Sequence, residues 1–234
     1  MGGDAKTGRE VRKRQLPSGR HGLSREYVAA NQRERILDAV ALHASRSGYW
    51  GMSLDSIAAA SGTSRRTFYT LFESKEAAFL TLCDVTAEQM LATVYAAYDS
   101  SEPLAERGFH CMAAIIGFLC EYPDRANVIF VQVLTAGPAA VTRRDLALQH
   151  LADLVERAVS DGGERDLPPS TTAEAVVGGL YQIIYGRILN DRVSELRDLM
   201  PEMLFMLLMP YIGHRAAATA RARATEVLSA APPS

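Results

Sequence analysis

The sequence predicts an all-α protein: a small N-terminal domain of three helices with a helix-turn-helix, followed by a larger helical domain. Apolar residues recur at the spacing of amphipathic helices along most of the 234 residues, and short Gly-, Pro- and Ser-containing breaks separate these runs. The stretch from Ser53 to Lys75, SLDSIAAASGTSRRTFYTLFESK, has the outline of two short helices around a tight turn and the start of a third. Both observations favour the same fold class.

Charge is distributed unevenly along the chain. Residues 1–75 contain 13 Lys and Arg residues against 7 Asp and Glu residues, a net charge of +6, whereas residues 76–234 contain 12 against 20, a net charge of −8. A basic first third favours a polyanionic partner for that part of the chain only. An uneven scatter of surface charge would give the same counts.

Membrane, disulfide and metal signals are weak. The charged N-terminus lacks the apolar stretch of a signal peptide, and the longest apolar run, Met203 to Ile212, is too short to span a bilayer. Cys83, Cys111 and Cys120 are widely spaced and form neither a zinc pattern nor a disulfide framework. We therefore expect a soluble, cytoplasmic protein with buried free cysteines, no metal and no membrane partner.

Residues 1–23 lack hydrophobic periodicity and are rich in glycine and basic residues, which predicts a disordered basic arm. Its cations could lie along DNA phosphates or enter a minor groove, or could simply keep the chain soluble. Residues 24–74 follow as the helix-turn-helix domain. Ser24 and Asn31 are both good helix caps, so we expect a short lead-in helix and then a main helix to about Ser47.

The link after the first helix is mostly apolar. Gly48 is expected to end the helix. Tyr49, Trp50 and Met52 are expected to fill the core of the small domain, with Gly51 letting the backbone turn between them.

Two short helices follow this link. Ser53 is the predicted N-cap of the first, Gly62 lies in the turn, and Ser64 is the predicted N-cap of the second, from Arg65 to Phe72. On that second helix Phe68, Leu71 and Phe72 share the apolar side. Arg66, Tyr69 and Thr70 point the other way, with Arg65 and Thr67 flanking them, and a solvated face is the simplest explanation of such a pattern.

The same polar face suits the major groove of DNA. Arginine is the commonest specific reader of guanine, each bidentate pair giving roughly 1–3 kcal/mol of discrimination. Hydroxyl groups of this face suit phosphate contacts. Lys75 is expected in the first turn of the next helix, where a cation is unfavourable unless a phosphate binds beside it, although Glu76 partly compensates. The predicted DNA-binding residues are Ser53, Ser64, Arg65, Arg66, Thr67, Tyr69, Thr70 and Lys75.

The segment GTSRRTFYTLFESKEAAFL resembles the TetR family of bacterial repressors, whose pattern runs Gly-x-Ser-x-x-Thr-(Leu/Phe)-Tyr-x-(His)-Phe-x-x-Lys-(Glu/Asp). The upstream segment GRHGLSREYVAANQRERIL is similar to a subgroup common in actinobacteria. The resemblance covers about residues 24–85. Leu71 departs from the pattern, because many members have a histidine there that touches DNA, and Thr70 is smaller than usual. The matching positions are Gly62, Ser64, Thr67, Phe68, Tyr69, Phe72, Lys75 and Glu76.

Residues 75–213 are expected to form the helical ligand-binding and dimerisation domain. The spacing predicts helices over about 75–98, 103–121 and 125–135, a longer helix from the Gly137-Pro138 break to about Ser160, and helices over about 172–190 and 196–212. A polar loop is expected near 161–170, and a C-terminal tail, 214–234, is expected to be helical at first and then to fray. The helix over 75–98 would join the two domains, so any signal between them would pass through it.

The last two strong helices are apolar nearly all round, which favours burial on two sides, against the core and against a second subunit. The resemblance implies the same homodimer, which would present two recognition helices to a near-palindromic operator. The predicted interface residues are Val177, Leu180, Ile184, Ile188, Phe205 and Leu208.

No catalytic residues and no cofactor are predicted, because catalytic motifs are missing and the histidines are scattered singly. The resemblance implies a small-molecule effector bound among the helices of the second domain. The predicted function is a repressor released from DNA by a small, largely apolar ligand; the alternative is a helical ligand-binding protein or enzyme that has lost DNA binding. The candidate pocket residues, each of which could instead simply fill the core, are Phe109, Met112, Ile116, Phe130, Leu134, His150, Tyr181 and Tyr185.

Overall fold

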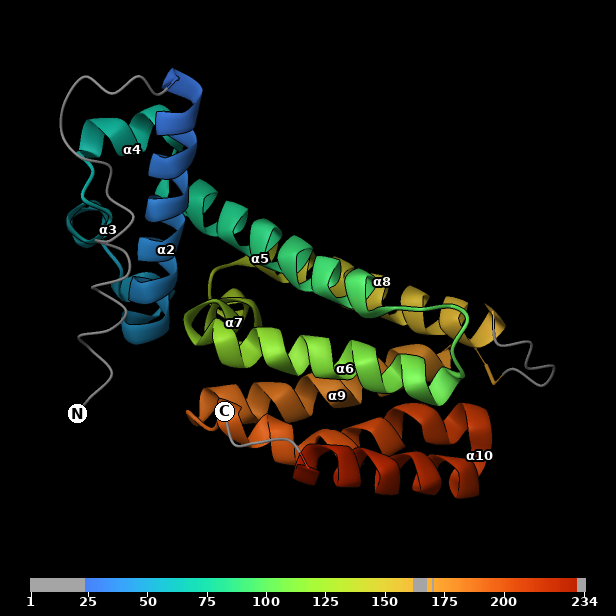
Figure 1. Ribbon diagram of the computed structural model, residues 1–234. Coiled ribbons are helices and arrows are strands. Elements are labelled where there is room, and N and C mark those ends of the chain that lie inside the picture. Colours follow the sequence, from blue (N-terminus) through green and yellow to red (C-terminus); the bar gives the residue numbers. More distant parts are fainter. Residues whose placement is uncertain (1–23, 162–167, 170, 231–234) are drawn as a thin grey trace.

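The computed structural model describes residues 24–161, 168–169 and 171–230, and all regular secondary structure in them is helical, as the sequence predicts (Figure 1). The predicted arm, 1–23, lies outside the described residues, as does most of the predicted loop. The helices and their bounds are α2 (Arg25–Gly51), α3 (Leu54–Ser61), α4 (Arg65–Leu71), α5 (Lys75–Ala97), α6 (Leu104–Glu121), α7 (Pro123–Phe130), η1 (Gln132–Leu134), α8 (Pro138–Asp161), α9 (Thr171–Leu189), η2 (Val193–Glu195) and α10 (Leu196–Ala230).

The first helix is continuous from Arg25, where the sequence predicted a lead-in helix and a second start. The Ser24 hydroxyl caps it by accepting from the Tyr27 amide. Its regular part ends at Gly48, as predicted, because Gly48 has a φ of 73° that few other residues adopt. Tyr49 and Met52 then turn into the core, but the prediction for Trp50 is wrong: it is 76% exposed and donates from Nε1 to the Thr135 carbonyl.

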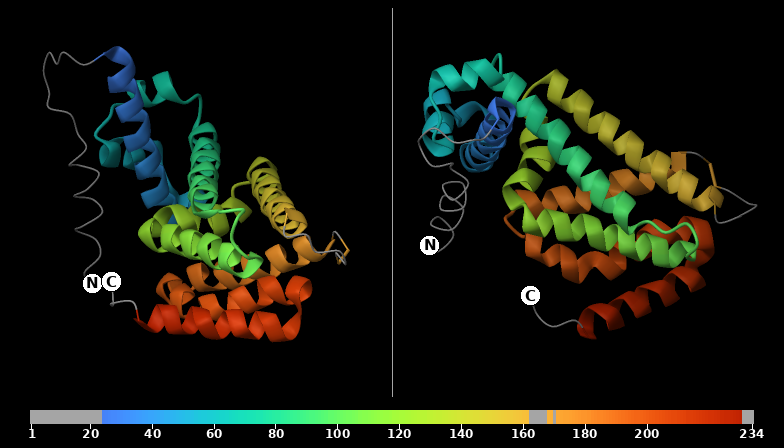
Figure 2. Two further views of the ribbon diagram at one scale, coloured as in Figure 1. Left: turned by 45° about the vertical axis from the view of Figure 1, so that its right-hand side comes forward. Right: turned by 45° about the horizontal axis from the view of Figure 1, so that its top comes forward.

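The small domain, α2 to α4, stands at one end of the molecule, and α5 leads from it into the helical domain (Figures 1 and 2). The core of the small domain continues across this junction. Val128 of α7 and Val133 of η1 are fully buried in the same cluster as Val40 and Phe79. The two domains therefore share packed side chains, so a shift of α7 would be felt at α2.

Helix α5 is long and apolar enough to meet the length and composition of a membrane span, the single such helix in the part of the chain that the structure describes. In this fold it is a core helix. Phe79, Leu82 and Met90 on its inner side are buried against the chain's own helices.

The C-terminal segment differs from the predicted tail. Helix α10 bends sharply at Gly213, which has a φ of 75°, and its second half folds back beside its first half as far as Ala230 (Figures 1 and 2). Ala217 and Ala224 are buried in the core of the helical domain, and Arg223 pairs with Glu106 of α6. The alanine-rich sequence thus serves as a close-packing helix rather than a fraying end.

Candidate DNA-binding face and ligand cavity

The turn between α3 and α4 is held by local caps and by one buried arginine. Gly62 adopts the left-handed conformation, with a φ of 60°, that the tight turn requires. The Arg35 side chain of α2 is 5% exposed and donates from Nη2 to the carbonyls of Ser61 and, at 3.0 Å, Gly62. A cation on the last carbonyls of a helix satisfies them and complements the helix dipole. Arg35 thus ties the C-terminal end of α3 to α2.

Two of the predicted DNA-binding serines act as helix caps. Ser53 and Ser56 form a capping box, with the Ser56 amide donating to Ser53 Oγ at 3.1 Å. Ser64 Oγ accepts from the Thr67 amide at 3.0 Å and lies 2.9 Å from Thr67 Oγ1. These hydroxyl groups fix the ends of α3 and α4, and Ser53, Ser64 and Thr67 all lie at the surface or close to it.

The two arginines of α4 differ in their partners. Arg65 donates from Nε and Nη2 to the two carboxylate oxygens of Asp55 at 2.6 and 2.5 Å, and these hydrogen bonds lower the pKa of the Asp55 carboxyl. Arg66 is exposed and has no ion pair with any described residue. Both side chains are on the surface, but only Arg66 has a free guanidinium fork.

The exposed side of α4 brings together the residues expected to meet DNA. Phe68 is buried and Tyr69, its neighbour, is 56% exposed, with the Phe68 and Tyr69 rings edge to face at 5.7 Å. Thr70 is exposed and donates to the Arg66 carbonyl one turn back. A helix of seven residues is stable only through its buried side, so its polar side is free for another molecule.

Lys75 has partners within the chain. Its Nζ donates to the carbonyls of Tyr49 and Met52 at 3.2 and 3.1 Å, and it sits 4.9 Å from the centre of the Tyr49 ring. These contacts offset the unfavourable position of the Lys75 charge in the first turn of α5, so a bound phosphate is not needed to explain it. This role of Lys75 is not predictable from the sequence, because nothing local in the sequence shows that residues 49–52 lie against the start of α5.

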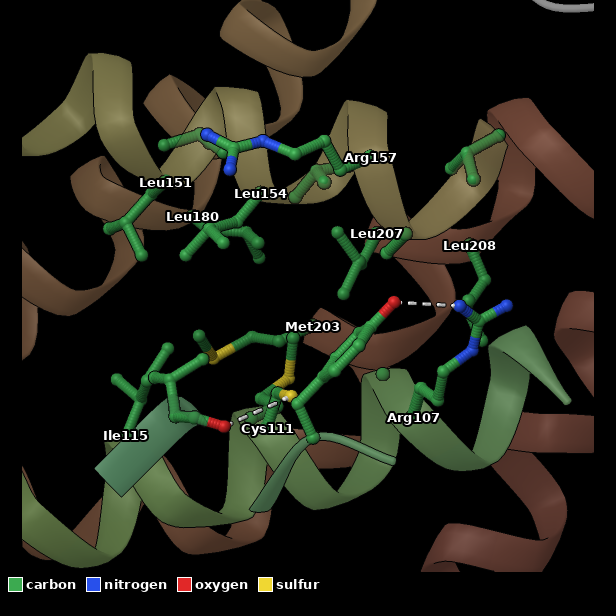
Figure 3. A pocket seen from close by; sticks show the side chains of 18 of the residues that line it. Arg107, Cys111, Ile115, Leu151, Leu154, Arg157, Leu180, Met203, Leu207 and Leu208 are labelled. Carbon is green, nitrogen blue, oxygen red and sulfur yellow. Dashed lines mark hydrogen bonds between the residues drawn. The ribbon is translucent and has the colours of Figure 1, made fainter. Parts of the chain in front are cut away.

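A cavity of about 450 Å³ lies among α5, α6, α8, α9 and α10 of the helical domain (Figure 3). Its volume falls within the range of about 300–1,000 Å³ that is usual for small-molecule sites. The wall is mostly apolar, with Ile115, Leu151, Leu154, Leu180, Met203 and Leu207 facing the space. Aromatic residues and the charged residues Arg107, Arg157 and Asp161 also line it. Arg107, buried near the start of α6, lies at one end of this cavity.

Four of the eight predicted pocket residues line this cavity: Met112, Ile116, Phe130 and Tyr181. The other four do not. Phe109 packs into the helical core, Leu134 is 38% exposed on η1, His150 is exposed on α8, and Tyr185 stacks behind Tyr181 at 6.4 Å. Cavity residues that the sequence did not single out include Arg107, Tyr98 and Tyr211.

The six predicted interface residues are used within the single chain. Val177, Ile184, Ile188 and Leu208 are buried, Leu180 lines the cavity, and Phe205 is covered by His214 and Arg221 of the returning half of α10. The all-round apolar sequence of these helices predicts an interface, but these particular side chains point inward. A second subunit would have to meet the opposite faces of α9 and α10.

Those opposite faces remain partly apolar. Leu189, Met206 and Met209 are 49%, 39% and 42% exposed. A side chain at Gly178 would meet no atom of the chain within 4 Å, and Gly179 lies against the end of Met206. Within residues 24–161, 168–169 and 171–230, no three His, Cys, Asp or Glu side chains come together in a way that could hold a metal ion.

Comparison with known proteins agrees with the helix-turn-helix in the small domain and with the all-helical fold. The family model described as "Bacterial regulatory proteins, tetR family" matches residues 36–82. No curated protein matches the chain. Among solved structures, the fatty acid degradation regulator FadR from Bacillus halodurans aligns with a TM-score of 0.69 at 17% identity, over 76% of this chain and 94% of that chain.

Two further similar structures contain bound molecules. The transcriptional regulator FadR from Bacillus subtilis, in complex with stearoyl-CoA, aligns with a TM-score of 0.61 at 16% identity, over 77% of this chain and 97% of that one. AibR, in complex with isovaleryl coenzyme A and operator DNA, aligns with a TM-score of 0.60 at 21% identity, over 77% of this chain and 100% of that one. At these identities the likeness establishes the fold.

Proposed function

This chain belongs to the TetR family of bacterial regulatory proteins, and on that premise we propose that it is a cytoplasmic, homodimeric repressor that a small, largely apolar ligand releases from a near-palindromic operator. The observation that carries the DNA-binding half of this proposal is the free polar face of α4. Arg66, Tyr69 and Thr70 stand on one side of a short helix whose other side is fixed in the core.

DNA reading is assigned mainly to Arg66. A guanidinium without an ion partner can donate two hydrogen bonds to the O6 and N7 atoms of a guanine. Arg65 could contact a base only by leaving Asp55. While it stays paired with Asp55, it orients α4 and reads no base. Ser53, Ser64, Thr67 and Tyr69 are assigned to phosphates, which fix the register of the helix without reading sequence.

Dimerisation is assigned to the outer faces of α9 and α10. Single exposed apolar side chains are ordinary, but Leu189, Met206 and Met209 form a partly apolar face together with the small residues Gly178 and Gly179. Small residues permit close approach of a second copy of the same helices, and a two-fold axis would pair each face with itself. Two α4 helices would then meet successive major grooves of an operator.

The ligand is assigned to the 450 Å³ cavity, and α7 connects that cavity to the DNA-binding domain. Phe130 at the end of α7 lines the cavity and stacks on Tyr181, whose hydroxyl donates to the Phe130 carbonyl at 2.9 Å. At the start of α7, Asp124 accepts from the Ser45 hydroxyl of α2 at 2.7 Å.

A second set of contacts completes this connection. Arg125 pairs with Asp38 of α2 at 2.8 Å, and Gln132 accepts from the Tyr49 amide at 3.2 Å. One short helix therefore touches both the cavity and α2. A ligand that prefers a shifted α7 would change the position of α2 to α4 and, in a dimer, the spacing of the two recognition helices.

The deciding experiment measures binding of the full chain to the intergenic DNA that flanks its own coding region. A regulator should protect a footprint with two-fold symmetry there. The logarithm of its affinity should fall linearly with the logarithm of salt concentration. The roomy cavity also suits a ligand-binding protein or enzyme that has lost DNA binding, and failure to retain any sequence selectively at low salt would establish that alternative and overturn the regulator.

A further inference from the structure

Arg107 is a buried cation at the end of an apolar cavity. It is 3% exposed, and it lines the cavity from the first turns of α6 (Figure 3). Its Nη1 donates to the Tyr98 hydroxyl at 2.9 Å, while its Nε is buried and has no hydrogen-bond partner. Among the described residues, no carboxylate is paired with it. A charge taken out of water without a counter-charge is unfavourable unless something else compensates it.

Asp161, an acidic residue that also lines the cavity, compensates this charge only indirectly. The Tyr98 hydroxyl in turn donates a hydrogen bond to Oδ2 of the exposed Asp161 carboxylate at 3.2 Å. The phenol thus separates Asp161 from the guanidinium, and Asp161 lies at the surface, where water screens it. Arg107 Nε is therefore a charged donor without an acceptor.

A second unused donor lines the same cavity. The Tyr211 hydroxyl is buried, lines the cavity and has no hydrogen-bond partner. Burial, and then the charge of Glu156, raise the pKa of Tyr211, so the hydroxyl keeps its proton. A side chain at Gly108 would meet Leu204 and Leu208, and Cys120 Sγ at the far end of α6 lies 3.7 Å from the Val193 carbonyl. Helix α6 and the first half of α10 therefore run antiparallel. The start of α6 is thus near the end of that first half, where Tyr211 lies.

We propose that this cavity binds an aliphatic carboxylate, with the carboxylate accepting from Arg107 Nε and the Tyr211 hydroxyl and the hydrocarbon chain filling the apolar part. This proposal rests on the proposed function only in taking the cavity as the ligand site. A carboxylate has two oxygen atoms for the two unused donors, and it supplies the missing counter-charge. The rest of the wall is mostly apolar, with aliphatic and aromatic side chains, and complements a hydrocarbon chain.

The test compares head groups on the unaltered full chain. Dodecanoate, methyl dodecanoate, dodecanol and dodecyl phosphate are titrated by calorimetry below the concentrations at which they form micelles. Dodecanoate should bind at least about tenfold more tightly than the ester and the alcohol, because a hydrogen bond to a charged group is lost with either. Tighter binding of dodecyl phosphate than of dodecanoate would overturn the assignment to a carboxylate.

Variants then test the residue. Arg107→Met should weaken dodecanoate binding by about tenfold to a hundredfold and leave dodecanol binding within about twofold, whereas Arg107→Lys should restore part of the preference for the acid. Arg157→Met is the matched control, because Arg157 also lines the cavity but is exposed. It should change dodecanoate binding little.

Equal affinities for the acid, the ester and the alcohol would overturn the proposal, and so would an equal loss of dodecanoate affinity in the Arg107→Met and Arg157→Met variants. If Arg107→Met does not fold, the head-group series on the unaltered chain decides alone. Selective DNA binding without any dodecanoate binding would overturn the carboxylate site and support the proposed DNA-binding function. Arg107-dependent dodecanoate binding without DNA binding would support the carboxylate site and overturn the proposed DNA-binding function.

Discussion

The ammonium group of Lys75 lies 3.2 Å from the carbonyl oxygen of Tyr49, and its charge also faces the Tyr49 ring at 4.9 Å. A third contact, to the Met52 carbonyl at 3.1 Å, closes the site. A lysine in the first turn of a helix repels the helix dipole, and here the two carbonyl dipoles and the ring offset that repulsion. Lys75 therefore fastens the start of α5 to the segment that joins α2 to α3.

Replacing Lys75 separates this structural role from a phosphate contact. Lys75→Ala should lower the free energy of unfolding by about 1–2 kcal/mol, because two carbonyls lose a charged donor. Thermal and urea unfolding of the free protein measure the change. Arg66→Ala, on the exposed face of α4, is the control and should stay within about 0.5 kcal/mol. If Lys75 served phosphate alone, stability would be unchanged and the salt dependence of DNA binding would fall by about one charge.

The two arginines of α4 should contribute differently to DNA selectivity. Arg66→Ala should relax the preference at one base pair by about 1–3 kcal/mol, since its guanidinium is free to meet a guanine edge. Arg65→Ala should weaken binding to all sequences more evenly, because Arg65 is paired with Asp55.

Asp55→Asn probes the same pair from the other side. This variant frees Arg65 and should leave the preference of Arg66 in place. Competition binding against a set of operators with single base-pair changes gives all three values. A relaxed base preference in Arg65→Ala, with Arg66→Ala unchanged, would exchange the two roles.

The helix-turn-helix was predictable because its determinants are local. Ser53 and Ser64 cap their helices through residues three positions ahead, and Gly62 takes the left-handed turn that its sequence context requires. Helical spacing likewise predicts α5, α6, α8 and α9 close to their observed bounds, but the single helix predicted over about 125–135 is instead α7, which ends at Phe130, followed by the separate turn η1. These features depend on neighbours in the sequence, so the sequence alone determines them.

The placement of single apolar side chains was not predictable in the same way. A helix that is apolar all round, such as α9, gives no sign of which side faces the core. Ile184 and Ile188 therefore turned out to be core residues, and the exposed face runs through Gly178 and Leu189. Arg107 was overlooked for a related reason: its importance comes from burial beside a cavity, which only the packing of α6 against α10 creates.

Communication through α7 can be tested at its contact with α2. Ser45→Ala removes the hydrogen bond to Asp124 and should reduce the effect of dodecanoate on DNA affinity by about 0.5–2 kcal/mol, because α2 then follows α7 less closely. Affinity for dodecanoate itself should stay within about twofold, since Ser45 is outside the cavity. Fluorescence anisotropy of labelled operator, with and without dodecanoate, measures the coupling.

Ser160→Ala is the control for this coupling variant. The Ser160 hydroxyl bonds within α8, to the Glu156 carbonyl, and it does not touch α2. An unchanged coupling in Ser45→Ala, or an equal change in Ser160→Ala, would place the communication elsewhere, in α5 or in the contacts of Arg125 and Gln132 with α2.

Acid should destabilise the small domain through His43. Burial lowers the pKa of His43 below its ordinary value of 6.5, more than its hydrogen bond with the Ser56 backbone raises it. The unfolded chain therefore takes up a proton at higher pH than the folded chain, so stability is full above about pH 6.5 and is lost as pH falls below it. His43→Gln should lose less stability than the unaltered chain between about pH 7.5 and pH 5.5, as measured by urea unfolding. Parallel pH profiles for the two proteins would contradict this.

The proposed dimer face predicts a sharp contrast between two exposed positions of α10. Met209 is 42% exposed on the face assigned to the second subunit, and Val227, on the returning half of the same helix, is 47% exposed. At a two-fold interface a lysine introduced at position 209 is buried without a partner in both copies at once. Met209→Lys should therefore shift the protein to monomers at micromolar concentration and weaken operator binding by at least about tenfold, because each monomer engages only one half-site. Sedimentation velocity and operator titration should find Val227→Lys unchanged in both respects, and a monomeric Val227→Lys with a dimeric Met209→Lys would move the interface to the C-terminal half of α10.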